Sequence, residues 1–164
     1  MEKYKEIRFV LIYVLFLNLG VAIAKLIFGF LANSLSMMAD ASHSFFDSTS
    51  NIVGLVAIRI ASKLPDKEHP YGHAKYENFA TIGIVILILI VCFEIIRGAI
   101  TRFLNPVHPD IERVTLTVMI ITLVVNVFVS RYEKRKGEKL KSPFLIADSI
   151  HTRTDIFASI SVIL

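Results

Sequence analysis

The sequence predicts an all-α membrane protein, a bundle of five transmembrane helices. Its 164 residues are 54% hydrophobic with a mean hydropathy of +0.63, and its charged residues gather in a few short blocks. A bilayer core about 30 Å thick needs roughly 20 mostly apolar helical residues, and five stretches approach that length. The formal charge of +4 does not indicate nucleic acid as a partner, because the basic residues flank the apolar stretches.

We expect spans at residues 9–31, 35–61, 79–100, 114–130 and 144–164, forming one transmembrane domain over 1–164. The first exceeds the apolar run of a signal peptide and is followed by further spans, so we interpret it as mature structure. The second and fifth contain ionisable residues, and the first contains Asn18 and Lys25, so these three should face one another. The third and fourth are plainly hydrophobic. Ser142 and Pro143 predict an N-cap and first turn for the fifth.

The distribution of Lys and Arg predicts the orientation. Thirteen lie before the first span or around the second and fourth connections, whereas three flank the third connection and none lies in the first. Because cytoplasmic loops carry the excess of basic residues, we expect a cytoplasmic N-terminus in the cell (inner) membrane. The basic run 131–141 is interpreted as an anchor that touches anionic lipid. His108, Pro109 and Asp110 should form a turn on the outer side.

One pattern occurs twice inside apolar spans. In the order Asp-x-x-His-x-x-x-Asp, its members are Asp40, His43 and Asp47, then Asp148, His151 and Asp155. Residues three and four apart share a helix face, so each copy forms a stripe, and two facing stripes would close one site. An ionisable side chain in hydrocarbon costs several kcal/mol unless it is paired, hydrated or bound, so a cluster there predicts function.

The inner four residues have the composition of a metal site. A neutral imidazole and a carboxylate four residues apart can reach one cation, and two such helices supply four ligands for tetrahedral Zn²⁺. We therefore predict that the ligands are His43, Asp47, His151 and Asp155. This donor set also accepts Co²⁺ or Cd²⁺, and Mn²⁺ remains compatible. Protons and metal would compete, because metal ligands must be deprotonated and histidine titrates near neutral pH.

Other interpretations of these residues are open. Each His could pair with its own Asp as a helix-stabilising ion pair, although the repetition favours a ligand role. Asp40 and Asp148 are second-shell acceptors or proton carriers in one interpretation, and neutralise Lys25 and Arg153 in the other. Cys92 is alone, so neither a disulfide framework nor a thiolate metal site can form within one chain.

Three segments carry a family resemblance. Asn18-Leu19-Gly20, Lys25, Gly29, Ser34 and Ser36 lead into the first motif, residues 69–77 read His-Pro-Tyr-Gly-His-Ala-Lys-Tyr-Glu, and the fifth span holds His151 and Asp155. The chain resembles the cation diffusion facilitator (cation efflux) family of divalent-metal/proton antiporters. The resemblance implies a six-helix transmembrane domain, a homodimer in a full-length form, alternating access, and zinc preference where histidine holds both positions of the quartet.

The resemblance also implies a metal site in the loop after the second span. Asp66 and His73 match its ligand positions, and His69 is a candidate third ligand; an ordinary polar turn is the competing interpretation. The chain departs from the family pattern because it lacks the sixth helix and the C-terminal cytoplasmic domain, so we expect a truncated form.

The sequence therefore predicts a secondary transporter that exports Zn²⁺, or else Cd²⁺, Co²⁺ or Mn²⁺, from the cytoplasm in exchange for protons. Its partners would be the metal ion, protons and the lipid bilayer, with no organic cofactor. The alternative is a non-transporting metal-binding or assembly fragment of such a transporter. An intramembrane metallohydrolase is disfavoured, because it needs an open metal position and a general base, and no His-Glu-x-x-His is present.

Overall fold

The chain folds as an up-and-down set of long helices, which confirms the all-α prediction for the residues that the structure describes. The computed structural model describes residues 2–31, 35–104 and 113–163, and within the helices some side chains, including that of His43, lie outside the description. The helices are α1 (Glu2–Leu31), α2 (Leu35–Ala61), α3 (Lys75–Leu104), α4 (Arg113–Leu140) and α5 (Pro143–Ile163). The predicted turn at His108, Pro109 and Asp110 lies outside the described residues.

The helices extend beyond the apolar stretches that predicted them. α1 begins at Glu2 rather than residue 9, and α4 continues to Leu140, so the basic run 131–141 is almost entirely helical. Lys, Arg and Glu are good helix formers, and no proline interrupts either segment. The α4–α5 connection is consequently only two residues long. Lys141 adopts a left-handed φ of 48° there, and Ser142 donates its backbone N–H to the Gly137 carbonyl at 2.9 Å, as in a Schellman helix end.

The predicted N-cap of α5 is confirmed. Ser142 Oγ accepts a 3.4 Å hydrogen bond from the backbone N–H of Leu145, and the same hydroxyl donates to Glu77 of α3 at 2.5 Å. Lys3 of α1 lies 3.7 Å from the other Glu77 oxygen and donates to the Lys141 carbonyl at 3.1 Å. These contacts join α1, α3 and the start of α5 at one end of the bundle.

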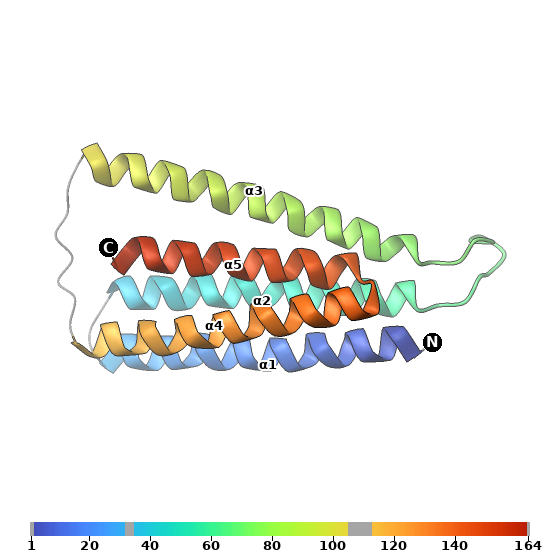
Figure 1. Cartoon of the computed structure of the whole chain (residues 1–164), viewed down its shortest axis with the longest axis horizontal. Coiled ribbons are helices and arrows are strands. Elements are labelled where there is room, and N and C mark those ends of the chain that lie inside the picture. Colours follow the sequence, from blue (N-terminus) through green and yellow to red (C-terminus); the bar gives the residue numbers. More distant parts are fainter. Residues whose placement is uncertain (1, 32–34, 105–112, 164) are drawn as a thin grey trace.

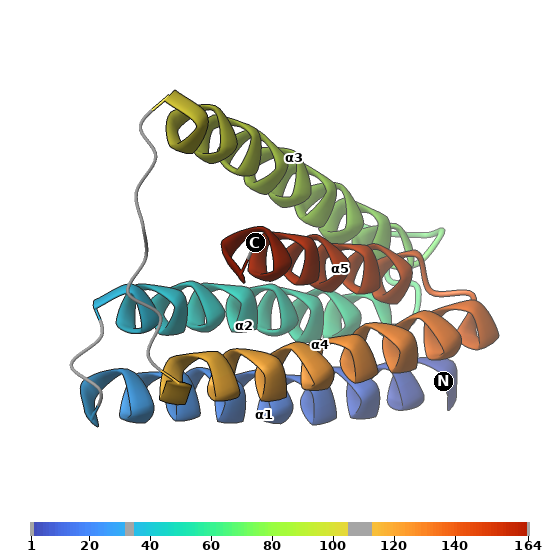
Figure 2. The same cartoon turned by 60° about the vertical axis from the view of Figure 1, so that its left-hand side comes forward.

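The five helices pack unevenly along their length. α1 packs mainly against α2, α4 against α5 and α1, and α3 against α5 and α2. In Figure 1 the N-terminus, the α2–α3 loop and the α4–α5 turn all lie at the right-hand end, so the three basic blocks gather at one end. α3 touches its neighbours there and diverges from them toward the other end, as Figure 2 shows from a second direction.

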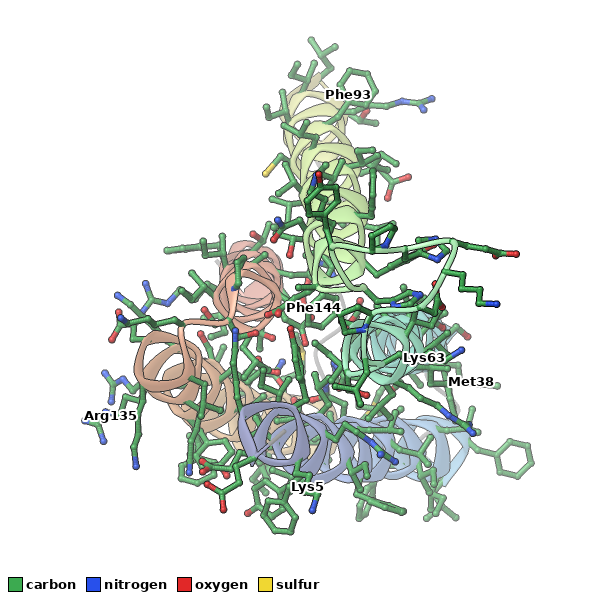
Figure 3. All side chains as sticks on the ribbon, turned by 90° about the vertical axis from the view of Figure 1, so that its right-hand side faces the viewer. Lys5, Met38, Lys63, Phe93, Arg135 and Phe144 are labelled. Carbon is green, nitrogen blue, oxygen red and sulfur yellow. The ribbon has the colours of Figure 1, made fainter. Side chains whose placement is uncertain are left out.

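Three stretches are long and apolar enough to cross a membrane by length and composition: Glu2–Leu31, Lys75–Glu94 and Leu116–Leu140. The searched residues of α2 and α5 do not meet that criterion, and these are the helices that hold the repeated motif. Many large apolar side chains project outward, including Phe16, Phe30 and Phe93, and Figure 3 shows Phe93 on α3 away from the other helices. A surface this apolar suits lipid, so the chain is an integral membrane protein.

The hydrophobic core lies toward the end of the bundle that holds the N-terminus. It consists of residues from all five helices: Ile7, Val10, Leu11, Val14, Ala57, Ile58, Ala80, Ile84, Val129, Phe144, Leu145 and Ala147. Seen along the bundle in Figure 3, Phe144 points into the space between the helices, whereas Lys5 and Arg135 point away from it. Phe144 is fully buried and packs where Gly54 leaves room on α2.

Gly54→Ala should destabilise the fold. A methyl group at this position would overlap the Phe144 ring and approach Leu11 at 3.3 Å, so α5 would have to shift against α2. Overpacking of this kind costs about 1–3 kcal/mol. Thermal unfolding in a mild detergent measures the effect. Gly83→Ala is the matched control, because nothing lies within 4 Å of its added methyl, and the change should be neutral or stabilise by up to about 1 kcal/mol. Equal unfolding temperatures for the two variants would contradict the prediction.

Candidate metal centre

A small polar cavity lies among α1, α2, α4 and α5. Its volume is about 20 Å³, room for about one water molecule or ion. Polar side chains form most of the wall, and the lining residues are Asn18, Val21, Ser44, Asp47, Ser50, Asn126, Asp148, His151, Thr152 and Asp155. Water-sized polar cavities inside a bundle of apolar helices are natural places for ions.

Three of the four predicted ligands converge on this cavity. Asp47 Oδ1 lies 3.7 Å from His151 Nε2, and one ligand atom from each of Asp47, His151 and Asp155 lies within 4.8 Å of the others. His151 is 4% exposed and Asp155 is 9% exposed. Ligand atoms around a tetrahedral zinc ion are about 3.3 Å apart, given bond lengths of about 2.0–2.1 Å. The three groups would therefore need to close by less than about 1.5 Å to hold one ion.

His43, the fourth predicted ligand, lies on α2 one turn before Asp47, and its side chain lies outside the described residues. α2 and α5 run in opposite directions (Figure 1). Moving one turn back along α2, from Asp47 to position 43, therefore corresponds to moving one turn forward along α5, from His151 to Asp155. The register of the two helices is compatible with the predicted quartet.

Asp148 joins α5 to α2 beside the cavity. It is 1% exposed, and its two oxygens accept hydrogen bonds from Ser50 at 3.1 Å and Asn51 at 2.8 Å. Asn51 lies beside Asn18 of α1, whose amide reaches it at 3.4 Å. Arg153, the cation that could have neutralised Asp148, is exposed and forms no ion pair with it among the described residues. The geometry thus favours the interpretation of Asp148 as a group that supports the site.

Asp40 behaves differently from its counterpart Asp148. Its carboxylate forms a 2.9 Å ion pair with Lys25 of α1, and the same ammonium donates to Ser44 at 2.9 Å. Lys25 is buried, so the pair satisfies a cation that would otherwise be costly to place between helices. Asp40 does not line the cavity, whereas Ser44 does. The arrangement favours the interpretation in which Asp40 neutralises Lys25.

The predicted loop residues also come together. His69 Nδ1 lies 3.2 Å from Asp66 Oδ1, and His73 Nε2 lies 3.4 Å from Asp66 Oδ2. The two imidazole rings are 4.4 Å apart at their centroids, and the three residues present ligand atoms within 4.8 Å of one another. His73 is buried while Asp66 is largely exposed. One carboxylate between two histidines is a compact donor set for a divalent cation.

Several residues of the centre were not predicted as site residues. Ser50, Thr152 and Asn126 line the cavity, and Asn51 holds Asp148. The fourth span was expected to be plainly hydrophobic, but Asn126 contributes to the wall; an amide inside an otherwise apolar run was the available signal. Glu133 is fully buried against α5, although it lies in the basic run 131–141 that was interpreted as an anchor touching anionic lipid.

Comparison with known proteins gives one family. Residues 11–164 match the cation efflux transmembrane domain. An uncharacterized transporter of Methanocaldococcus jannaschii is 33% identical over 146 residues, covering 89% of this chain and 52% of the relative. The manganese efflux system protein MneP of Bacillus subtilis is 31% identical, covering 98% and 54%. A cadmium, cobalt and zinc/H(+)-K(+) antiporter of Bacillus velezensis is 32% identical, covering 88% and 46%. The chain spans about half the length of these relatives.

The Asp66 carboxyl should stay ionised to a lower pH than an ordinary aspartate. The backbone N–H of His69 donates to Asp66 at 2.7 Å, and this hydrogen bond, with the adjacent imidazoles, holds the pKa of the carboxyl below its usual value near 4. A group with a lowered folded-state pKa stabilises the fold above its ordinary pKa and loses that effect only as pH falls through the lowered value. NMR titration of the Asp66 carboxyl should therefore give a midpoint below that in a peptide of residues 60–68, which lacks His69. Equal midpoints would contradict the prediction.

Proposed function

The chain belongs to the cation efflux family and matches the transmembrane domain of that family. On that premise, we propose that it exports a divalent metal cation in exchange for protons. The ion would bind to His43, Asp47, His151 and Asp155. The observation that carries the proposal is the convergence of Asp47, His151 and Asp155 on a buried polar cavity between α2 and α5. A group of ionisable side chains inside a membrane bundle is costly, and a bound cation offsets that cost.

Zn²⁺ is the proposed substrate, with Cd²⁺, Co²⁺ and Mn²⁺ as alternatives. Two imidazoles and two carboxylates suit zinc, and the absence of thiolates from the quartet leaves the ion exchangeable. Among the relatives, one is named for manganese efflux and one for cadmium, cobalt and zinc, so relatedness alone leaves the metal open. The choice of Zn²⁺ as the substrate therefore rests on the chemistry of the four ligands.

We propose that all five helices cross the membrane, with the N-terminus in the cytoplasm. α2 and α5 owe their polarity to the proposed site, which favours a place inside the bundle rather than outside the membrane. The basic blocks gather at the end that holds the N-terminus, and an excess of Lys and Arg favours the cytoplasmic side. We further propose that the protein acts as a homodimer in the cell membrane.

Proton exchange follows from competition at the same ligands. A proton on His151 occupies a ring nitrogen that the metal needs, so loading metal releases protons and protonation releases metal. Asp148, which lines the cavity, is proposed to assist this proton traffic. The loop cluster of Asp66, His69 and His73 is proposed as a second metal site at the cytoplasmic end of α3.

Removing a ligand should abolish tight zinc binding. Asp47→Ala, His151→Ala and His43→Ala should each weaken Zn²⁺ by more than 100-fold, because losing even outer-shell partners of a metal costs about 10–100-fold. Isothermal titration calorimetry on the purified chain, with Asp66→Ala added throughout to silence the loop cluster, measures the change. Glu138→Ala is the control, since Glu138 is exposed and, among the described residues, its carboxylate pairs only with Lys134 at 3.7 Å. Unchanged affinity in Asp47→Ala and His151→Ala would overturn the site assignment.

Zinc transport should follow a proton gradient. In proteoliposomes, Zn²⁺ should accumulate on the acidic side of the membrane, and a protonophore should abolish the accumulation. A zinc-sensitive dye inside the vesicles reports the flux, and Asp47→Ala gives the background. Flux that ignores the gradient would refute proton exchange. Zinc binding without any flux would instead favour the alternative, a metal-binding or assembly fragment.

A further inference from the structure

Two carboxyl groups meet between α4 and α5, outside the proposed ligand set. Glu133 is 0% exposed and Asp148 is 1% exposed. Their side chains are within hydrogen-bonding distance of each other, and the Thr152 hydroxyl also reaches Glu133 Oε2 at 3.5 Å. Asp148 lines the cavity, whereas Glu133 does not line it and reaches Asp148 from α4. The pair is therefore continuous with the wall of the cavity.

A hydrogen bond between two carboxyl groups requires a proton on one of them. Two carboxylates would offer only acceptors, and in a site shielded from water their negative charges would repel strongly. Glu133 faces no cationic side chain among the described residues, and the ionisable cation that acts on Asp148 there is the imidazole of His151. The Lys side chains that form ion pairs there meet other acids: Lys25 meets Asp40, Lys3 meets Glu77 and Lys134 meets Glu138.

The groups that surround the pair also leave it short of positive charge. From α2, Ser50 and Asn51 face Asp148, and both are neutral. On α5 itself the ionisable neighbours are Asp155 and His151, and the imidazole of His151 acts on Asp148 as well as on Asp47, but not on Glu133. Among the described residues, a proton on the pair is the charge compensation that remains for Glu133.

The hydrogen-bond donors indicate which oxygen carries the proton. Both oxygens of Asp148 already accept hydrogen bonds, from Ser50 and from Asn51. Among the described residues, Glu133 receives only the long contact from Thr152 at Oε2, and no donor there reaches its buried Oε1. Donors favour the ionised form of the acid that they contact. Asp148 is thus the better-stabilised carboxylate, and Glu133 is the acid that donates.

We propose that Glu133 and Asp148 form a proton-binding site that holds one proton at neutral pH, beside the metal cavity and without using its four ligands. The site does not depend on metal transport, because it follows from the burial and hydrogen bonding of these two side chains. It places a bound proton beside the wall of the cavity, on a residue of the basic run 131–141, which the sequence predicted to be an anchor that touches anionic lipid.

Infrared spectroscopy tests the proposal directly. The intact chain in lipid at neutral pH, with metal removed by a chelator, should show the C=O stretch of one protonated carboxyl group shielded from water. Glu133→Gln should abolish that band, because its amide can donate to Asp148 in place of the acid. Glu138→Gln, an exposed change five residues along the same helix, should leave the band intact. A wild-type spectrum without the band, or a band that persists in Glu133→Gln, would overturn the proposal.

Isotope labelling keeps the test decisive if Glu133→Gln does not fold. Side-chain ¹³C labelling of glutamate in the wild-type chain should move the band to lower frequency, whereas labelling of aspartate should leave it in place. A band that moves with neither label would overturn the proposal. Because no metal is added, failure here leaves the proposed transport function untouched, and failure of zinc binding leaves the proton site untouched.

Discussion

The buried carboxylate of Asp148 fixes the relationship between α2 and α5. Leaving such a group without partners would cost several kcal/mol, so α5 is constrained to stand where Ser50 and Asn51 of α2 can donate to it. Since the two helices are antiparallel, this alignment brings Asp47 and His151 together one turn further along. The polar contact that satisfies Asp148 therefore also sets the register of the cavity.

The packed end of the bundle holds this alignment in place. Phe144 fills the space over Gly54, and Ser142 ties the start of α5 to Glu77 of α3, so the first turn of α5 is held by both apolar and polar contacts. Toward the other end α3 leaves the bundle (Figure 2). The cavity thus lies along the part of α5 that follows this anchored first turn.

The sequence predicted the parts of the centre that repeat, and missed those that occur once. Asp47, His151 and Asp155 were found because helical spacing recurs in two apolar spans, where an ionisable group is itself a signal. Glu133 gave no such signal, because it lies among the lysines and arginines of the run 131–141, which are typical of a segment at the membrane surface. Its burial depends on α4 continuing past the apolar stretch and on the two-residue turn that folds α5 back onto it, and both are tertiary effects. Partners such as Ser50 and Asn51 are too common in polar helices to be singled out.

Charge at the cavity links the metal site with the proton pair. Asp47, Asp155 and Asp148 bring negative charge to one small space, against which the described residues set only the titratable His151. If Glu133 were also ionised, a fourth negative charge would lie beside the wall, and no lysine or arginine among the described residues offsets it. A proton on Glu133 removes that charge, while leaving Asp148 ionised and facing the cavity. The proposed arrangement would keep the negative charge that a divalent cation needs, without the full repulsion of four buried carboxylates, which would otherwise drive α4 and α5 apart.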